Sequence, residues 1–333
     1  RVISHALRNL IQESEHVFII GHKNADMDSI GAAIGVLKAV QLNKRKGYIV
    51  LDQSNPSIDR LMEEIQEHEP LFQHFITPER AVQLCDNQSL LVVVDTHKPS
   101  LVMEPKLLHT SSRVVVIDHH RRSEEFIHEP VLVYMEPYAS STCELVTELL
   151  QYQSDKIVMD PIEATALLAG IVVDTKSFAL RTGSRTFEAA SFLRRVGADT
   201  ALIQGLLKED IDQFNRRAEI IRNTEVVYDR IAIAVGVEDQ RYGQLLIAQT
   251  ADTLLNMNGI QASFVVSYIG DGYVSISARS LGQINVQVIM EQLGGGGHLT
   301  NAATQLEGIT QEEAIMRLKE VLDDQIQEGG VTT

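Results

Sequence analysis

Six side chains of the types that bind divalent metal ions follow apolar runs in this sequence. They are His22, Asp26, Asp28, Asp95, His119 and Asp174. Three of the runs, at 17–21, 90–94 and 113–117, are short and rich in β-branched residues, like strands buried on both faces of a parallel sheet. In open α/β sheets, function gathers at the carboxyl ends of the strands. We therefore expect the six side chains to meet at one edge of a sheet.

The charge of this group favours bound cations. Its four carboxylates would repel one another or take up protons unless cations lay between them. Two divalent ions would balance them, and the imidazoles of His22 and His119 would complete the ligand set. Oxygen and imidazole ligands without thiolate favour Mn²⁺, with Mg²⁺ or Fe²⁺ as alternatives, over a structural zinc site. A single aspartate after a strand is usually a helix cap or a turn residue, but four of them after apolar runs favour metal.

The spacing of these residues resembles a known superfamily. His22-x3-Asp26-x-Asp28, Asp95, Asp118-His119-His120 and Asp174 resemble the four motifs of the DHH phosphoesterases. The four glycines at 294–297, followed by His298, resemble the signature of the associated DHHA1 domain. Within the superfamily, the segments 21–33 and 138–146 are most similar to the catalytic region of the GdpP/YybT family of cyclic di-AMP phosphodiesterases.

The resemblance implies a reaction and a division of the ligands. His22 and Asp26 would bind one ion, Asp28, His119 and Asp174 would bind the other, and Asp95 would bridge the two. A hydroxide activated by both ions would open cyclic di-AMP, a nucleotide second messenger, to linear 5′-pApA. Asp118 would hold a ligating imidazole as a hydrogen-bond acceptor. His120 would contact a phosphate oxygen or protonate the leaving alkoxide, the alternative being a structural histidine bonded to a backbone carbonyl.

Further candidate substrate contacts have structural alternatives. Ser141 begins a capping box with Glu144, yet Ser140 and Ser141 would also stand at a helix N-terminus suited to phosphate. Gly295 and Gly296 could bring backbone amides close to a phosphate or base, or simply form a turn. Arg279 could pair with a phosphate or with an acidic neighbour. The DHHA1 resemblance favours substrate binding for Arg279, Gly295, Gly296 and His298.

The elements that must position these residues form two domains. Strand and helix patterns alternate through 1–197, which predicts an α/β domain with a parallel sheet and helices on both faces. A helical connector is expected over 198–228, with one long charged helix at 210–227. A smaller mixed α/β domain is expected over 229–330, including a hairpin at Gly270-Asp271-Gly272. The resemblance places the active site in the cleft between the two domains.

Composition limits the class of protein. The 333 residues have a net charge of −16, which argues against a general nucleic-acid binder but not against a small nucleotide in a metal-neutralised site. Two cysteines, Cys85 and Cys143, indicate buried thiols in a reducing compartment. No apolar stretch is long enough to span a bilayer.

The context of the chain is also an expectation. It begins at Arg1 without an initiator methionine, as a piece of a longer protein would. The resemblance implies a parent anchored at the cytoplasmic face of the membrane, from which this soluble part is taken, and the chain could form a homodimer.

Other functions remain open at this point. One is a nanoRNase/pAp phosphatase that acts on short linear oligonucleotides, and a family II pyrophosphatase is more distant. A third is a sensor that binds a dinucleotide without hydrolysing it. The complete set of six ligands favours an enzyme over a sensor.

Overall fold

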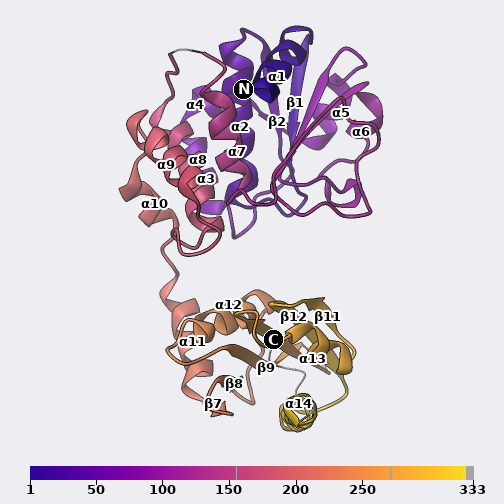
Figure 1. Cartoon of the computed structure of the whole chain (residues 1–333), viewed down its shortest axis with the longest axis vertical. Helices are drawn as coiled ribbons and strands as arrows, with labels where there is room; N and C mark the ends of the chain where they lie inside the picture. The colour runs from indigo at the N-terminus through magenta and orange to yellow at the C-terminus, as the bar shows by residue number, and fades with distance from the viewer. Residues whose placement is uncertain (155, 271, 328–333) are drawn as a thin grey trace. The chain divides into compact units, whose positions relative to one another are not determined.

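The chain forms two compact units in the computed structural model, which describes residues 1–154, 156–270 and 272–327. The first unit is Arg1–Lys208 and the second begins at Glu209 (Figure 1). This boundary falls within the segment 198–228 for which the sequence predicts a connector. None of the helices in the described ranges combines the length and apolar character that crossing a bilayer requires.

Six parallel strands form the sheet of the first unit. They are β1 (His16–Ile20), β2 (Lys46–Val50), β3 (Phe75–Ile76), β4 (Leu90–Val94), β5 (Arg113–Asp118) and β6 (Leu132–Met135). Their order is β3-β2-β1-β4-β5-β6, so the winding of the chain reverses between β1 and β4. Such a switch point is where open α/β sheets bind ligands. The parallel sheet expected from the sequence is confirmed.

Each strand divides its side chains between two cores. Val17 and Ile19 pack with α2 (Met27–Leu42), α7 (Thr142–Leu150) and α8 (Pro161–Asp174). Phe18 and Ile20 pack on the opposite face with α5 (Pro78–Leu84) and α6 (Leu107–Thr110). Because helices cover both faces, the strands are apolar at successive positions.

The remaining helices of the first unit complete these two layers. They are α1 (Val2–Gln12), α3 (Asp59–Gln66), α4 (Glu69–Phe72), the 3-10 helix η1 (Pro99–Leu101), α9 (Ser184–Arg195) and α10 (Thr200–Leu206). Two glycines on α2 allow it to lie directly against its neighbours. A Cβ at Gly31 would come within 2.5 Å of the Ala166 carbonyl, and one at Gly35 within 2.5 Å of Val146. This close packing brings the start of α2 to the end of α8.

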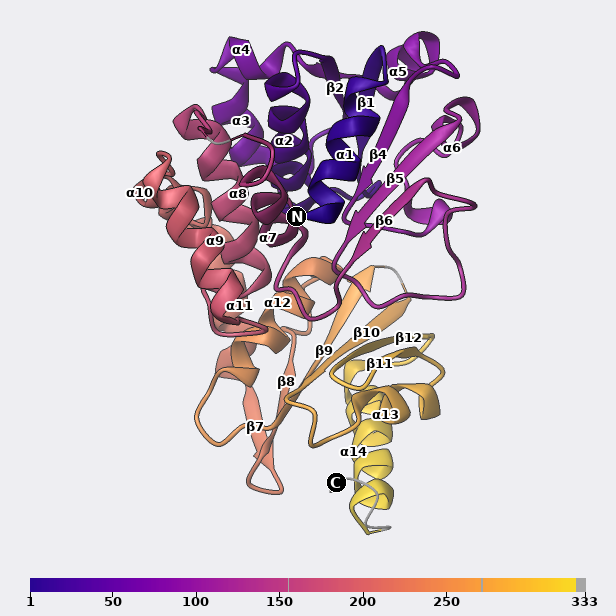
Figure 2. The same ribbon diagram turned by 45° about the horizontal axis from the view of Figure 1, so that its top comes forward.

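The second unit has a mixed sheet. Its elements are α11 (Ile211–Arg222), β7 (Thr224–Val227), β8 (Ile231–Val235), α12 (Gln244–Leu255), β9 (Ala262–Gly270), β10 (Tyr273–Ser280), α13 (Val286–Gln292), β11 (Gly296–His298), β12 (Asn301–Glu307) and α14 (Gln311–Gln327). The order is β11-β12-β10-β9-β8-β7, and only β8 and β9 pair in parallel (Figure 2). One face packs on α11 and α12, and the other on α13 and α14.

The second unit differs from the sequence prediction in two places. The long helix expected over 210–227 ends at Arg222, and Thr224–Val227 pairs with β8 as a strand because three of its four residues are β-branched. Strands β11 and β12 were not predicted. At the expected hairpin, β9 and β10 pair antiparallel and Gly272 has φ +81°, while Asp271 lies outside the described residues.

Candidate metal centre

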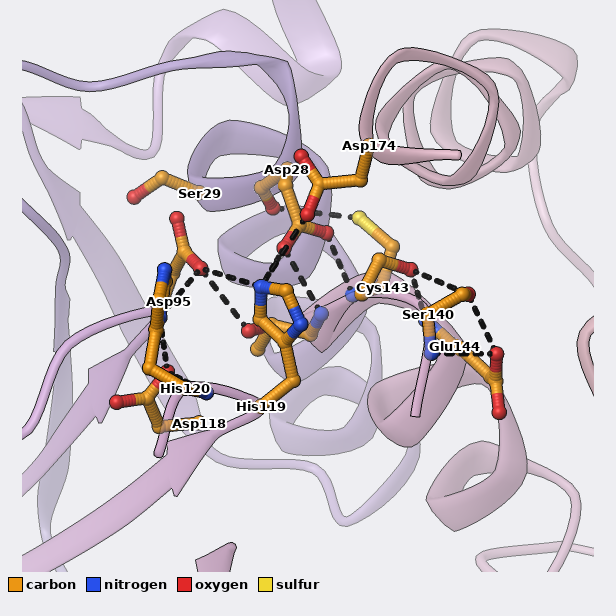
Figure 3. A network of polar contacts seen from close by, with 12 residues as sticks. Asp28, Ser29, Asp95, Asp118, His119, His120, Ser140, Cys143, Glu144 and Asp174 are labelled. Atoms are coloured by element: carbon orange, nitrogen blue, oxygen red, sulfur yellow. Dashed lines mark hydrogen bonds and ion pairs between the residues drawn. The ribbon is translucent and has the colours of Figure 1, made fainter. Parts of the chain in front are cut away.

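Three carboxylates surround one imidazole nitrogen at the carboxyl edge of the parallel sheet. The Nε2 atom of His119 lies 3.2 Å from Asp174 Oδ2, and 3.8 Å from both Asp28 Oδ2 and Asp95 Oδ1 (Figure 3). Asp28 stands in the first turn of α2, Asp174 is the last residue of α8, and Asp95 follows β4. The structure thus brings together four of the six predicted ligands.

Two groups of side chains in this cluster have the spacing of metal ligands. One atom from each of Asp28, His119 and Asp174 lies within 4.8 Å of the others, and so does one from each of Asp95, His119 and His120. The first group is the ligand set that the resemblance to DHH phosphoesterases implies for one of the two ions. The second group includes His120, for which the sequence predicts a phosphate contact instead.

His22 and Asp26 fall outside both groups. The Nδ1 atom of His22 accepts a hydrogen bond from the Asn24 amide (2.9 Å), which leaves Nε2 as the nitrogen that could bind an ion. Asp26 is the N-cap of α2, because its Oδ1 accepts from the Ser29 amide (2.9 Å). Their part in a metal site stays a prediction.

The N-terminus of α7 binds one of the cluster's own carboxylates. The amides of Thr142 and Cys143 donate to Oδ2 and Oδ1 of Asp28, each at 2.8 Å, and the Thr142 hydroxyl donates to Asp95 (3.1 Å). A helix N-terminus favours an anion, and here that anion is Asp28. The anchor holds the buried Asp28 in one orientation.

The serines expected to bind phosphate are buried at the same helix end. Ser141 caps α7 by accepting from the Glu144 amide (3.1 Å). The amide and hydroxyl of Ser140 donate to Glu144 Oε2, at 3.1 and 2.5 Å, and the Thr186 hydroxyl donates to the same oxygen (2.6 Å). Because Ser140 and Ser141 are 0% exposed, a substrate would reach them only by displacing these contacts. Their predicted contact with phosphate stays a prediction.

Asp118 holds two imidazoles, neither of them among the six predicted ligands. Its Oδ1 accepts from the amide (3.1 Å) and Nδ1 (2.7 Å) of His120, and its Oδ2 lies 2.6 Å from Nδ1 of His97. Burial alone would raise the pKa of Asp118, but the hydrogen bonds from His120 and His97 hold that pKa below its usual value. Sequence reasoning missed His97, although it stands two residues after Asp95 at the end of β4.

In the second unit, Arg279 forms the ion pair that the sequence left as its alternative role. Its Nε lies 3.1 Å from Asp252 Oδ1, and its Nη1 donates to the Ser277 hydroxyl (3.3 Å) and the Ala278 carbonyl (3.0 Å). The side chain is 13% exposed. A phosphate would therefore have to share Arg279 with Asp252.

The glycine run packs against the neighbouring strand. A Cβ at Gly295 would come within 2.2 Å of the Ala303 carbonyl, and one at Gly297 within 2.4 Å of the Asn301 carbonyl. Gly296 has open space instead, since a Cβ there would meet nothing within 4 Å. His298 is exposed and pairs with Asn301, which in turn pairs with Arg279 across the sheet. Packing thus explains two of the glycines and leaves Gly296 and His298 accessible.

Comparison with known proteins gives the family. Residues 16–171 match the family model described as "DHH family, N-terminal domain", and residues 223–328 match the model described as "DHHA1 domain". The chain belongs to the DHH/DHHA1 family. The carboxylate cluster lies in the first unit, where every member except Asp174 falls within the DHH match, whereas Arg279 and the glycine run fall within the DHHA1 match.

Relatives with curated names match this DHH/DHHA1 chain along nearly its whole length. It is 58% identical to the cyclic-di-AMP phosphodiesterase GdpP of Bacillus subtilis, over 99% of this chain and 51% of that protein. It is 55% identical to the cyclic-di-AMP phosphodiesterase PdeA of Listeria monocytogenes, over 97% of this chain and 50% of that protein. The chain therefore spans about half the length of these relatives.

A solved structure has the same fold. The exopolyphosphatase-related protein from Bacteroides fragilis matches with a TM-score of 0.80 at 18% identity, over 97% of this chain and 96% of that one. At this identity the match concerns the fold alone. It agrees with the parallel sheet of the DHH domain and the mixed sheet of the DHHA1 domain.

The electrostatics of the DHH domain fit a bound cation. Burial raises the pKa of Asp28, with help from the charge of Asp174, and burial with the charges of Asp28 and Asp26 raises the pKa of Asp95 well above its usual value. Burial would lower the pKa of His119, but its contact with Asp174 and the charge of Asp28 raise that pKa. The shifts show that the carboxylates repel one another and share protons with the imidazole of His119. A bound cation would neutralise this repulsion without any proton.

The donor chemistry of the cluster supports the same fit. The ligand atoms are carboxylate oxygens and imidazole nitrogens, a set that suits Mn²⁺ or Mg²⁺. The nearby thiol of Cys143 donates to the backbone carbonyl of Asp28 (3.2 Å), and burial raises its pKa well above the usual value. It is therefore a neutral packing group, not a thiolate ligand.

Proposed function

We propose that this chain is the catalytic part of a metal-dependent phosphodiesterase that hydrolyses cyclic di-AMP to linear 5′-pApA. The observation that carries the proposal is the 58% identity to a cyclic-di-AMP phosphodiesterase over 99% of the chain. It is supported by a cluster of aspartates and histidines at the switch point of the parallel sheet. Phosphate-ester hydrolysis is one of the reactions that such clusters support when they hold divalent ions.

Two cations, most favourably Mn²⁺, would be held by the six residues that the motifs identify. Asp28, His119 and Asp174 would bind one ion, His22 and Asp26 the other, and Asp95 would contact both. When bound, such ions lower the pKa of a water molecule and neutralise charge on the phosphate. The protein contributes a buried ligand, Asp28, that the α7 amides already hold in place.

His120 and Asp118 would serve the leaving group. The carboxylate of Asp118 binds Nδ1 of His120 and so directs Nε2 of the same ring away from it. The His120 side chain is 54% exposed, so Nε2 can reach a substrate. Attack of water at phosphorus would break the bond to the 3′ oxygen, which takes up a proton from His120 as the linear product forms.

The DHHA1 domain would contribute selectivity. Arg279 and His298 offer positive or donating groups, and the amides near Gly295 and Gly296 can approach a phosphate or base closely. Ser140 and Ser141 of the DHH domain could bind the substrate only after their present hydrogen bonds with Glu144 break. We assign to these six residues the recognition of the dinucleotide.

Product analysis tests the proposal. Cyclic di-AMP, cyclic di-GMP, pApA and pAp are each incubated with the protein and Mn²⁺, and products are separated by chromatography. Cyclic di-AMP should give pApA, with EDTA abolishing the reaction and Mn²⁺ restoring it. Faster release of adenosine monophosphate from pAp or pApA than cleavage of cyclic di-AMP would establish the nanoRNase/pAp phosphatase instead. Binding of cyclic di-AMP without any product in Mn²⁺ would identify a sensor.

A further inference from the structure

A row of hydrogen bonds runs from a loop of the DHH domain to the exposed His120. It begins at Ser123, whose amide donates to Nε2 of His97 (3.2 Å). Nδ1 of His97 lies 2.6 Å from Oδ2 of Asp118, and Oδ1 of Asp118 lies 2.7 Å from Nδ1 of His120. His97 is thus the residue that faces Asp118 from the side opposite His120.

The row fixes where the proton of His97 lies. A backbone amide can only donate, so Nε2 of His97 accepts from Ser123 and carries no proton. The ring proton is therefore on Nδ1, from which it is donated to Asp118. The Ser123 hydroxyl lies 3.0 Å from the same Nε2 and 2.7 Å from the Glu125 carbonyl, and its single proton can serve either acceptor.

Burial excludes direct chemistry by His97. Its side chain is 2% exposed, that of Asp118 is 0% exposed, and the His97 ring stacks on Phe126 with centroids 5.3 Å apart. His97 is therefore almost shut off from solvent and belongs to neither of the two candidate ligand groups. What it can do is hold one oxygen of Asp118, so that the other oxygen stays aimed at His120. Without that donor, Oδ2 of Asp118 would stay buried and lose the hydrogen bond that it accepts from Nδ1 of His97.

We propose that His97 is a positioning residue: it fixes the carboxylate of Asp118 and, through it, the ring of His120 that faces the phosphate. The inference rests on the proposed function, because it uses the contact of His120 with a phosphodiester. It differs from that function in naming a buried residue on which the orientation of His120 depends.

A purely structural role would have a different signature. The His97 ring accepts from the Ser123 amide (3.2 Å) and stacks on Phe126, so the side chain also anchors the loop that contains these two residues. Loss of that anchor would lower activity whether or not His120 is present. Loss of positioning would lower activity only while His120 is present, and this difference separates the two roles.

A double-mutant cycle on the whole chain makes the test. The variants are His97→Leu, His120→Gln and the pair, with His97→Asn as the conservative variant because its amide nitrogen can take the place of Nδ1. His97→Leu should lower kcat about 10–100-fold with little change in KM, as loss of such supporting hydrogen bonds does. The same substitution should cost almost nothing further in the His120→Gln background. His97→Asn should recover most of the lost kcat.

Two kinetic results would overturn the proposal: an equal loss of kcat with and without His120, or a Leu variant as active as the Asn variant. A readout independent of turnover is ¹⁵N NMR of the histidine rings, in which His97 should carry its proton on Nδ1. A proton on Nε2 would also exclude the proposal. Calorimetry should find unchanged Mn²⁺ affinity in His97→Asn.

The design keeps this inference separate from the proposed function. If the wild-type chain failed to cleave cyclic di-AMP, the cycle would be measured on bis-p-nitrophenyl phosphate or whichever phosphodiester it does cleave. Failure of the substrate assignment would then leave the coupling between His97 and His120 measurable. Absence of coupling on a good substrate would reject the positioning role alone.

Discussion

Asp28 and Asp95 are buried carboxylates that suit a bound cation but destabilise the metal-free protein. Both are almost fully removed from water, and each faces another carboxylate. Burial and the charge of Asp174 raise the pKa of Asp28, and burial with the charges of Asp28 and Asp26 raises that of Asp95. Repulsion or protonation here costs free energy in the metal-free protein, and a bound cation removes that cost.

Asp95→Asn should therefore stabilise the metal-free protein near neutral pH. A carboxyl whose pKa is higher in the folded than in the unfolded state contributes stability at low pH, and this is lost as the pH rises through the folded-state pKa. Asparagine does not ionise, so the variant does not lose this stability as the pH rises. It should melt at a higher temperature than wild type at pH 7 to 8 in EDTA, by about 2–4 °C for each kcal/mol added to the free energy of unfolding. The two proteins should converge near about pH 4, where the unfolded carboxyl also binds a proton.

Thermal melts with and without Mn²⁺ measure this effect. Mn²⁺ should raise the melting temperature of wild type more than that of the variant, because Asp95 is a proposed ligand. Asp52→Asn, at an exposed aspartate of the same unit, is the matched control and should change neither value. A variant that melted below wild type in EDTA at pH 7 would contradict the account of Asp95.

At the scale of elements, the cluster depends on how closely three helices pack. Helix α8 brings Asp174 to Asp28 of α2, and α7 anchors Asp28 through its first amides. Gly170 of α8 allows this approach. A Cβ at that position would come within 2.4 Å of the Cys143 Sγ and 2.9 Å of the Asp28 Cα. Any residue larger than glycine would push these helices apart where the ligands converge.

Gly170→Ala should consequently weaken Mn²⁺ binding and destabilise the first unit. Overpacking of this kind costs about 1–3 kcal/mol, against a gain of up to about 1 kcal/mol from better helix propensity. Gly205→Ala is the matched control, because a Cβ in that helix would meet nothing within 4 Å. It should keep Mn²⁺ affinity and be slightly stabilised. Calorimetric titration of both variants gives the comparison, and equal affinities would show that α8 can shift without cost.

The sequence predicted the strands of the DHH domain well because apolar runs and polar ends are local signals. The meeting of Asp95 and His119 could be predicted because the two runs form neighbouring parallel strands, and the carboxyl ends of such strands lie at the same edge of the sheet. What it missed depends on partners far along the chain: the hydrogen bond from Cys143 to Asp28 spans 115 residues. The helix expected through 227 was wrong because β-branched residues after Asn223 pair with β8.

The glycine run shows a similar limit in the DHHA1 domain. Four successive glycines predict freedom of the backbone, but not which of them need it for packing. Gly295 and Gly297 are required by the closeness of β12, a contact that only the paired strands reveal. Gly294 has a φ of +80°, a conformation that favours glycine, whereas neither packing nor backbone conformation gives a reason for Gly296. Gly296 stays a candidate for substrate contact.

At the scale of the whole molecule, the first unit contains all members of the candidate ligand groups. The first unit also has its own two cores, one on each face of its sheet. The second unit begins at Glu209 and has separate cores around its mixed sheet. Each unit therefore has the apolar interior that independent folding requires.

A chain of residues 1–208 should fold and bind Mn²⁺ but lose its preferred substrate. It keeps the whole cluster and lacks Arg279, Gly296 and His298, to which we assign recognition. Slow cleavage of bis-p-nitrophenyl phosphate should persist, while cleavage of cyclic di-AMP disappears. Circular dichroism and Mn²⁺ titration check that the shortened chain is folded. Cleavage of cyclic di-AMP at a near-normal rate would show that the DHH domain recognises the dinucleotide by itself.

The backbone of Asp95 has a consequence for inheritance. Its φ of +63° lies in the left-handed region, where asparagine and glycine are better tolerated than most residues. Both are reached from either aspartate codon by a single base change. Each removes the carboxylate of a proposed ligand while fitting the turn, so these two substitutions should give folded proteins with little activity. If cells were selected for loss of the proposed activity, changes at position 95 would be expected among the survivors. The variant protein would still be folded and present in those cells.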